Sequence, residues 1–317
     1  MNWVNKKKLL VIETIKYNSQ QYVDINNLWC ALHSTFNMAN NCQVDTSILD
    51  EISDKSIVPW LKFSRDEFKF ALSSCKNSST PGPDKLSWNH LKTIFDDIEC
   101  HDTFVWIANA CINLEYWLSH FKTSTMIIIS KPNKKSYNSP KSFRPIVLLN
   151  MMGKLIKKVI GERLQFHTVS NDFIHLSQLG GLKFKSTTDA GIVLMHAIRT
   201  GWVKNLTTST LVFDITQFFP SLNHQLLSLI IKKAGFDQRI SSFFADYLVN
   251  RKTNYSWSNL SSPTFNINIR VGQSSVFSPI LSALYLSLFI YILENQLKNL
   301  KIPTSFISFV DDSLFIS

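Results

Sequence analysis

Residues 307–316 read ISFVDDSLFI, an aspartate pair with apolar residues on both sides. The pattern predicts a strand, an acidic turn and a second strand. Residues 210–215, TLVFDI, form another apolar run, and this predicted strand delivers Asp214 at its end. Side chains alternate between the two faces along a strand, but a turn interrupts that alternation. Both acids of the pair can therefore approach one side of a sheet.

Carboxylates at the ends of apolar strands are suited to Mg²⁺, a hard ion that prefers oxygen ligands. Two such ions, about 4 Å apart, can activate a hydroxyl group and stabilise a leaving pyrophosphate. The residues alone leave a second interpretation open, because hairpin turns often contain Asp for backbone reasons.

The composition indicates a folded, basic protein. Of 317 residues, 45% are hydrophobic and 18% are charged, which supplies a buried core and excludes a disordered or fibrous chain. Lysine and arginine exceed the acids by 33 to 23, a net charge of +10. Such an excess favours a polyanionic partner, although a merely soluble basic protein remains an alternative.

Cysteine usage and hydropathy favour a protein in a reducing, intracellular compartment that is neither secreted nor embedded in a membrane. The five cysteines form no CxxC pair, so a disulfide framework and a zinc site are not expected. Glu13 and Lys16 interrupt the apolar N-terminal stretch, which argues against a signal peptide. The uncharged run at 276–293 carries Pro279 and three serines, and we expect a buried core helix there.

Residues 1–75 are predicted to be helical segments separated by polar turns, and 77–83 are a breaker run. Further predicted elements are helices at 85–122, 149–164, 192–203, 224–234, 239–249 and 278–299, and strands at 125–130 and 264–271.

Six groups of residues follow one another in a distinctive order. They are TPGPDK at 80–85, KP at 131–132 with FRPIVLL at 143–149, QLGG at 178–181 with STTDA at 186–190, FDITQFFPSL at 213–222, VGQSSVFSPIL at 271–281 and FVDD at 309–312. From about residue 78 onward, this order resembles the reverse transcriptase of non-LTR (LINE-type) retrotransposons. Each motif is weak by itself, whereas the complete series in order is specific.

The resemblance implies an α+β fold, the fingers and palm of a right-hand polymerase, with an antiparallel palm sheet backed by helices. We expect residues 78–317 to form these parts and residues 1–77 to form a helical N-terminal extension. Ser317 lies five residues past Asp312, so the thumb is expected to be missing.

The resemblance also implies the site residues. Asp214, Asp311 and Asp312 would be catalytic and, with the backbone carbonyl of Ile215, would bind two Mg²⁺ ions, which Mn²⁺ can replace. The expected nucleotide-binding residues are Lys131, Arg144, Phe219 and Gln273. Each residue also has an alternative interpretation. The aspartates could be solvated turn residues, and Phe219 could be an ordinary core residue. Lys131 and Arg144 could be solvated surface charges, and Gln273 could be a structural polar residue.

Other matching positions receive lesser roles. Template phosphate would be contacted by lysines 134, 135, 154, 157 and 158. The alternative for each lysine taken singly is a solvated surface charge. Asp84 and Asp189 are expected to have structural or template-side roles.

The function implied is RNA-directed DNA polymerase activity, with an RNA template, a DNA primer and dNTPs as partners and no cofactor beyond metal and nucleotide. Arg270 and Ser274 stand where the family usually has glycine, which permits close backbone approach. The alternative is an inactive retroelement fragment that only binds nucleic acid. A metal-dependent nuclease built on the same carboxylates is a third reading, and it predicts no need for Lys131 and Arg144.

Overall fold

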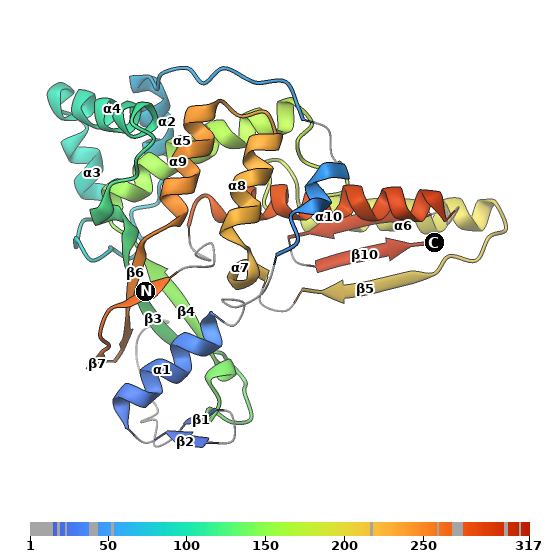
Figure 1. Cartoon of the computed structure of the whole chain (residues 1–317), viewed down its shortest axis with the longest axis horizontal. Helices are drawn as coiled ribbons and strands as arrows, with labels where there is room; N and C mark the ends of the chain where they lie inside the picture. Colours follow the sequence, from blue (N-terminus) through green and yellow to red (C-terminus); the bar gives the residue numbers. More distant parts are fainter. Residues whose placement is uncertain are drawn as a thin grey trace.

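The computed structural model describes residues 15–17, 20–22, 24–37, 44–51, 54–215, 218–258, 260–267, 275–300, 304–310 and 312–317. Three sheets, of which one is a two-stranded hairpin, and a group of packed helices make up this part of the chain (Figure 1). The mixture of helices with antiparallel strands confirms the predicted α+β class.

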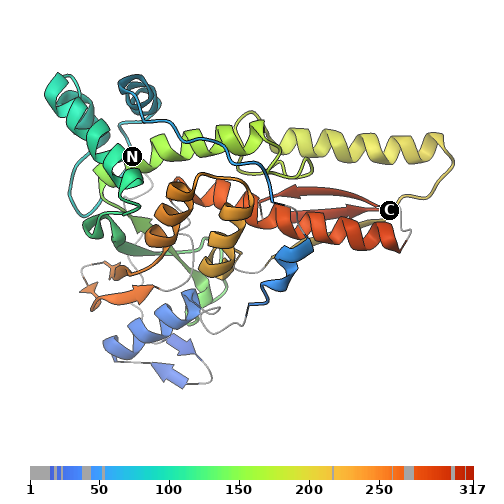
Figure 2. The same cartoon turned by 45° about the horizontal axis from the view of Figure 1, so that its top comes forward.

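One sheet has three antiparallel strands in the order β5-β10-β9. We call it the palm sheet because it contains the strands expected in the palm. They are β5 (Thr210–Asp214), β10 (Asp312–Ile316) and β9 (Ser305–Phe309), so the predicted strand–turn–strand unit is confirmed. One face carries Phe213 and Phe315, stacked with ring centroids 5.3 Å apart, and both pack against the main core. Helix α6 (Thr187–Val203) packs against β9 and runs along the sheet (Figure 2).

A second sheet, which we call the fingers sheet because it contains the residues expected in the fingers, has the order β4-β3-β6-β7, with β8 paired to β6. Strands β3 (Thr123–Ser130) and β4 (Phe143–Leu148) form an antiparallel pair, whereas β3 and β6 (Arg251–Trp257) are parallel. The shorter strands are β7 (Leu260–Ser261) and β8 (Phe265–Ile267).

Helix α1 (Ile25–Phe36) packs on the fingers sheet and buries an aromatic stripe there. Trp29 and Tyr255 stack with their ring centroids 6.4 Å apart, and Leu32 is fully buried. This small core joins the N-terminal part of the chain to the sheet.

The main core is built by helices from all parts of the chain. They are α2 (Arg65–Ser73), α3 (Trp88–Ile94), α4 (Ile98–Asn113), α5 (Met151–Ser170), α8 (His224–Lys233), α9 (Gln238–Leu248) and α10 (Ser278–Asn299). Among the described residues, α10 is the one helix that is long and apolar enough to cross a membrane. Half of its most apolar stretch is buried inside the protein. Ile280, Leu281 and Ile290 of α10 belong to the core, as the sequence predicted.

The N-terminal stretch is less helical than predicted. Strands β1 (Ile15–Tyr17) and β2 (Gln20–Tyr22) form a hairpin, and residues 54–63 run mostly extended between the short helix η2 (Ser47–Glu51) and α2. Residues 54–63 contact the loop between α8 and α9, where the Val58 amide donates to the carbonyl of Gly235 at 2.8 Å. The boundary at residue 77 stays a prediction.

Helix α5 begins at a cap supplied from the TPGPDK stretch. Its own N-cap residue, Asn150, makes no side-chain capping bond, and instead Asp84 Oδ2 accepts from the Met151 amide at 2.5 Å. A Cβ on Gly82 would come within 2.0 Å of the Leu149 carbonyl oxygen, so this close approach requires glycine. Asp84 thus has a structural role.

Replacing Asp84 with Ala should lower the free energy of unfolding by about 1 kcal/mol, because the first turn of α5 loses an acceptor and a favourable negative charge. Urea unfolding followed by circular dichroism measures this change. Asp84→Asn keeps an oxygen acceptor, so we expect it to lose less. Equal losses for the two variants would show that the cap bond is not what stabilises α5.

Candidate active site

Asp214 and Asp312 face each other across the palm sheet. The two residues pair directly in the antiparallel register of β5 and β10. Both side chains are exposed. Residues paired in this way have Cβ atoms about 5 Å apart on the same face, and like charges there are destabilising. A bound cation would relieve that repulsion.

Asp311 lies outside the described residues. Phe309 pairs with Asp312, and Val310 lies in the short turn between β9 and β10. Val310 has φ of 61°, a left-handed conformation that is strongly unfavourable for a β-branched residue. Such a turn is maintained only where surrounding contacts hold it.

The two described carboxylates are a suitable donor set for a divalent ion such as Mg²⁺, which takes oxygen ligands. Among the described residues, no three His, Cys, Asp or Glu side chains lie close enough together to hold a metal ion. Asp311 is not one of the described residues. Ile215 follows Asp214 directly and is half-buried. The role of its carbonyl oxygen stays a prediction.

Lys131 and Arg144 lie together at one end of the β3–β4 pair, on the fingers sheet and not on the palm sheet. Arg144 is exposed on β4, and Lys131 follows β3, where its amide donates to the Ser142 carbonyl at 2.9 Å. Burial lowers the pKa of Lys131 below its ordinary value, and the charges of Lys134 and Arg144 lower it further. The structure therefore concentrates positive charge at this position.

The remaining predicted nucleotide contacts are less defined. Phe219, in the short helix α7 (Phe218–Ser221), is half-buried against the main core, with its ring centroid 5.8 Å from that of Phe218. Its predicted place beneath a nucleotide sugar stays a prediction. Gln273, Arg270 and Ser274 lie outside the described residues.

A family model described as reverse transcriptase (RNA-dependent DNA polymerase) matches residues 129–317, more than half of the chain. The chain belongs to the reverse transcriptase family.

Three relatives come from transposable elements. The probable RNA-directed DNA polymerase from transposon X-element of Drosophila melanogaster is 25% identical over 280 residues, which are 83% of this chain and 30% of the relative. The corresponding protein from transposon BS, of the same fly, is 24% identical over 69% of this chain and 24% of its own length. A retrovirus-related Pol polyprotein from type-1 retrotransposable element R1 of Bradysia coprophila is 23% identical over 60% of this chain and 18% of the relative. The matched part spans less than a third of each relative.

One predicted template contact of this reverse transcriptase domain is wrong. Lys157 is only 1% exposed, and its ammonium group lies 5.9 Å from the ring centroid of Trp117 and 5.8 Å from that of Tyr247. Burial holds the pKa of Lys157 well below its ordinary value, and neighbouring Arg251 and Lys154 contribute. A cation enclosed by aromatic rings inside the reverse transcriptase domain is not available to a template strand.

Sequence reasoning also left two roles undefined. Asp189 completes a capping box with Ser186 at the start of α6, so its role in the reverse transcriptase domain is structural. Gln178 was noted only as part of a motif, yet its buried side chain contacts the turn that carries the acidic pair. The available signal was the pair of glycines two positions after Gln178, because adjacent glycines allow another segment to approach the backbone closely.

Proposed function

We propose that this chain forms the fingers and palm of an RNA-directed DNA polymerase that extends a DNA primer with dNTPs on an RNA template. The observation that carries the proposal is the direct pairing of Asp214 with Asp312, whose side chains are both exposed, at one end of the palm strands. Two like charges in register destabilise a sheet unless they serve a cation. Membership of the reverse transcriptase family supports the same assignment.

The proposed reaction is an in-line displacement. The primer 3′-hydroxyl group loses its proton to water, and its oxygen forms a bond to the α-phosphorus of the dNTP. The bond from that phosphorus to the bridging oxygen breaks, and pyrophosphate leaves with that electron pair. Two Mg²⁺ ions, when bound, supply activation of the hydroxyl group and stabilisation of the leaving group. Asp214 and Asp312, together with Asp311, which precedes Asp312 in the sequence, would hold those ions at fixed positions.

The fingers residues would orient the triphosphate. Arg144 can donate two parallel hydrogen bonds to phosphate oxygens, whereas Lys131 provides a point charge. The lowered pKa of Lys131 reflects burial beside two other cations, and a bound polyanion offsets that unfavourable environment. These residues would therefore raise the affinity for dNTP without selecting a base.

The test is primer extension by the purified 317-residue chain on an RNA template annealed to a DNA primer, with Mg²⁺ and dNTPs. Filter binding of the same duplex is measured in parallel. Extension on the template supports the polymerase. Binding without extension would refute it and show a fragment that only binds nucleic acid, and cleavage of the duplex would indicate a nuclease.

Replacing Arg144 with Ala should raise the KM for dNTP about tenfold or more, because a charge-assisted contact to phosphate is worth about 1.5–3 kcal/mol. Single-nucleotide extension at varied dNTP concentration measures KM and kcat separately. Arg199→Ala removes the same charge from an exposed position on α6 and should leave the KM for dNTP unchanged. Equal effects of the two substitutions would mean that Arg144 acts only through net charge.

A further inference from the structure

A short segment after α5 lies along the free edge of the palm sheet. We call residues 175–181 the edge segment. Its backbone forms a parallel bridge to β9, in which the Leu179 amide donates to the Ser308 carbonyl at 2.8 Å and the Ser308 amide donates to the Ser177 carbonyl at 2.9 Å. The edge segment therefore ends beside the turn between β9 and β10.

The side chain of Gln178 connects the edge segment to that turn. It is 1% exposed, and its Nε2 donates to Ser308 Oγ at 3.3 Å. Its Oε1 accepts from the Gly180 amide at 2.8 Å and from the Val310 amide at 3.3 Å. One buried amide thus satisfies groups of both the edge segment and the turn, and a buried network of this kind is costly to leave partly unsatisfied.

The two glycines allow the edge segment to lie this close. A Cβ on Gly180 would be 2.1 Å from the Val310 nitrogen, so no larger residue fits without moving the turn. Gly181 has φ of +76°, and a Cβ there would lie 2.9 Å from the side chain of Pro279 at the start of α10. The edge segment is therefore held between the turn and α10.

The start of the edge segment is anchored to α10. The His175 amide donates to Ser287 Oγ at 2.9 Å, and His175 Nε2 lies 3.2 Å from Glu294 Oε2. Because α10 is a core helix, these contacts give Gln178 a rigid support.

We propose that Gln178 is a positioning residue that holds Val310 in its left-handed turn, and so places Asp312 opposite Asp214 for cation binding. The inference rests on the proposed function, because it assigns to the acidic pair the binding of divalent ions. Gln178 contacts neither substrate nor ion and acts through the turn. Without its Oε1, the Val310 amide loses an acceptor, and a β-branched residue is free to leave an unfavourable conformation.

The test compares Gln178→Met with Gln165→Met in the full chain. Both replace glutamine with a side chain of similar size, but Gln165 is on α5 and its buried Nε2 has no partner among the described residues. The measurements are Mn²⁺ binding by electron paramagnetic resonance, hydrogen exchange at the Val310 amide, and the Mg²⁺ concentration that gives half-maximal extension.

We expect Gln178→Met to weaken Mn²⁺ binding about tenfold or more, as for other residues that orient metal ligands, and to raise the Mg²⁺ midpoint similarly. Its Val310 amide should exchange faster, and Gln165→Met should match the unsubstituted chain in all three measurements. Ser308→Ala removes the acceptor of Nε2 and the contact of Ser308 Oγ with Ser313 Oγ, but it leaves the acceptor of the Val310 amide in place. It should therefore give a smaller shift, which keeps the test open if Gln178→Met does not fold.

An unchanged Mn²⁺ affinity in Gln178→Met would overturn the inference, even if the melting temperature fell, because a purely structural role lowers stability without altering ion binding. If the unsubstituted chain extends no primer, the proposed function fails. The Mn²⁺ titration and the exchange rate at Val310 then decide the inference by themselves.

Discussion

Replacing Asp214 with Asn is expected to reduce primer extension at least about a hundredfold, because the reaction depends on charge placed in advance at the reacting phosphate. Asp312→Asn should have an effect of the same order, since the two carboxylates are paired in register. Asparagine has the same shape as aspartate, so the palm sheet should remain intact. Rates are measured by single-turnover extension at saturating dNTP.

The same substitutions should leave thermal stability unchanged or slightly raised, because they remove like charges that face each other across β5 and β10. Asp96→Asn is the matched control, an exposed aspartate remote in sequence from the palm strands, and it should retain full extension. A variant at Asp214 that keeps normal extension would show that the acidic pair is a structural feature of the hairpin and not the site of catalysis.

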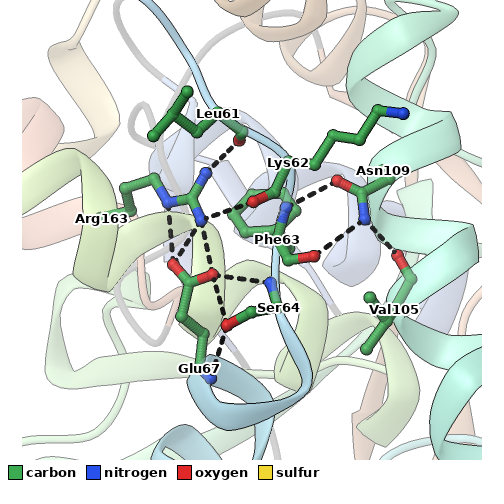
Figure 3. A network of polar contacts seen from close by, with 8 residues as sticks. All are labelled: Leu61, Lys62, Phe63, Ser64, Glu67, Val105, Asn109 and Arg163. Atoms are coloured by element: carbon green, nitrogen blue, oxygen red, sulfur yellow. Dashed lines mark hydrogen bonds and ion pairs between the residues drawn. The ribbon is translucent and has the colours of Figure 1, made fainter.

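The second large effect is expected at Arg163 of α5, which closes a network over the extended N-terminal stretch (Figure 3). Its guanidinium group donates to Glu67, at 2.5 Å from Nη2 to each carboxylate oxygen, and also to the carbonyls of Leu61 and Lys62. It also lies 4.3 Å from the ring centroid of Phe63. The side chain is 13% exposed, so water does not replace these contacts.

Glu67 itself completes the capping box of α2 with Ser64, and Asn109 of α4 holds the backbone of Phe63 on the other side. The network in Figure 3 therefore joins three helices through one segment. Losing the guanidinium group leaves the partly buried carboxylate of Glu67 with Ser64 as its remaining donor, and it removes the donor of the Leu61 and Lys62 carbonyl oxygens.

Replacing Arg163 with Ala should lower the free energy of unfolding by about 2 kcal/mol, because the charge-assisted hydrogen bonds to the partly buried Glu67 are lost. Urea unfolding monitored by tryptophan fluorescence measures the change, and Trp60 in this region is a sensitive reporter. Arg65→Ala is the control, because the pair of Arg65 with Asp102 is about half exposed and should contribute little. Similar losses for both variants would contradict the special role of the Figure 3 network.

Local patterns predicted most of the elements that carry the site. The helices α5, α8, α9 and α10 and the strands of the palm follow from apolar periodicity and from turn residues, which act over a few neighbours. Lys131 and Arg144 were also expected to act together, and β3 and β4 bring them to one end of a hairpin. Residues 54–63 were wrongly predicted to be helical, because their conformation depends on partners such as Gly235 far along the chain. Strands β1 and β2 were also missed, although they pair with each other locally.

Burial could not be read from charge alone. Lys157 was expected to contact template phosphate because its segment resembles that of the family, yet rings from the segment after α4 and from α9 enclose it. Gln178 likewise looked like one more polar residue of a motif. Its importance comes from Val310 and Ser308, which are adjacent to it only in the folded protein.

The sequence by itself determined the family, the types of element and the presence of an acidic turn between two apolar strands, because these depend on residue order and short-range periodicity. Only the tertiary structure decided that Asp312 stands opposite Asp214, and that a buried amide supports the turn beside them. Strand register and close backbone approach are set by segments remote in sequence, whose side chains must fit one another in space.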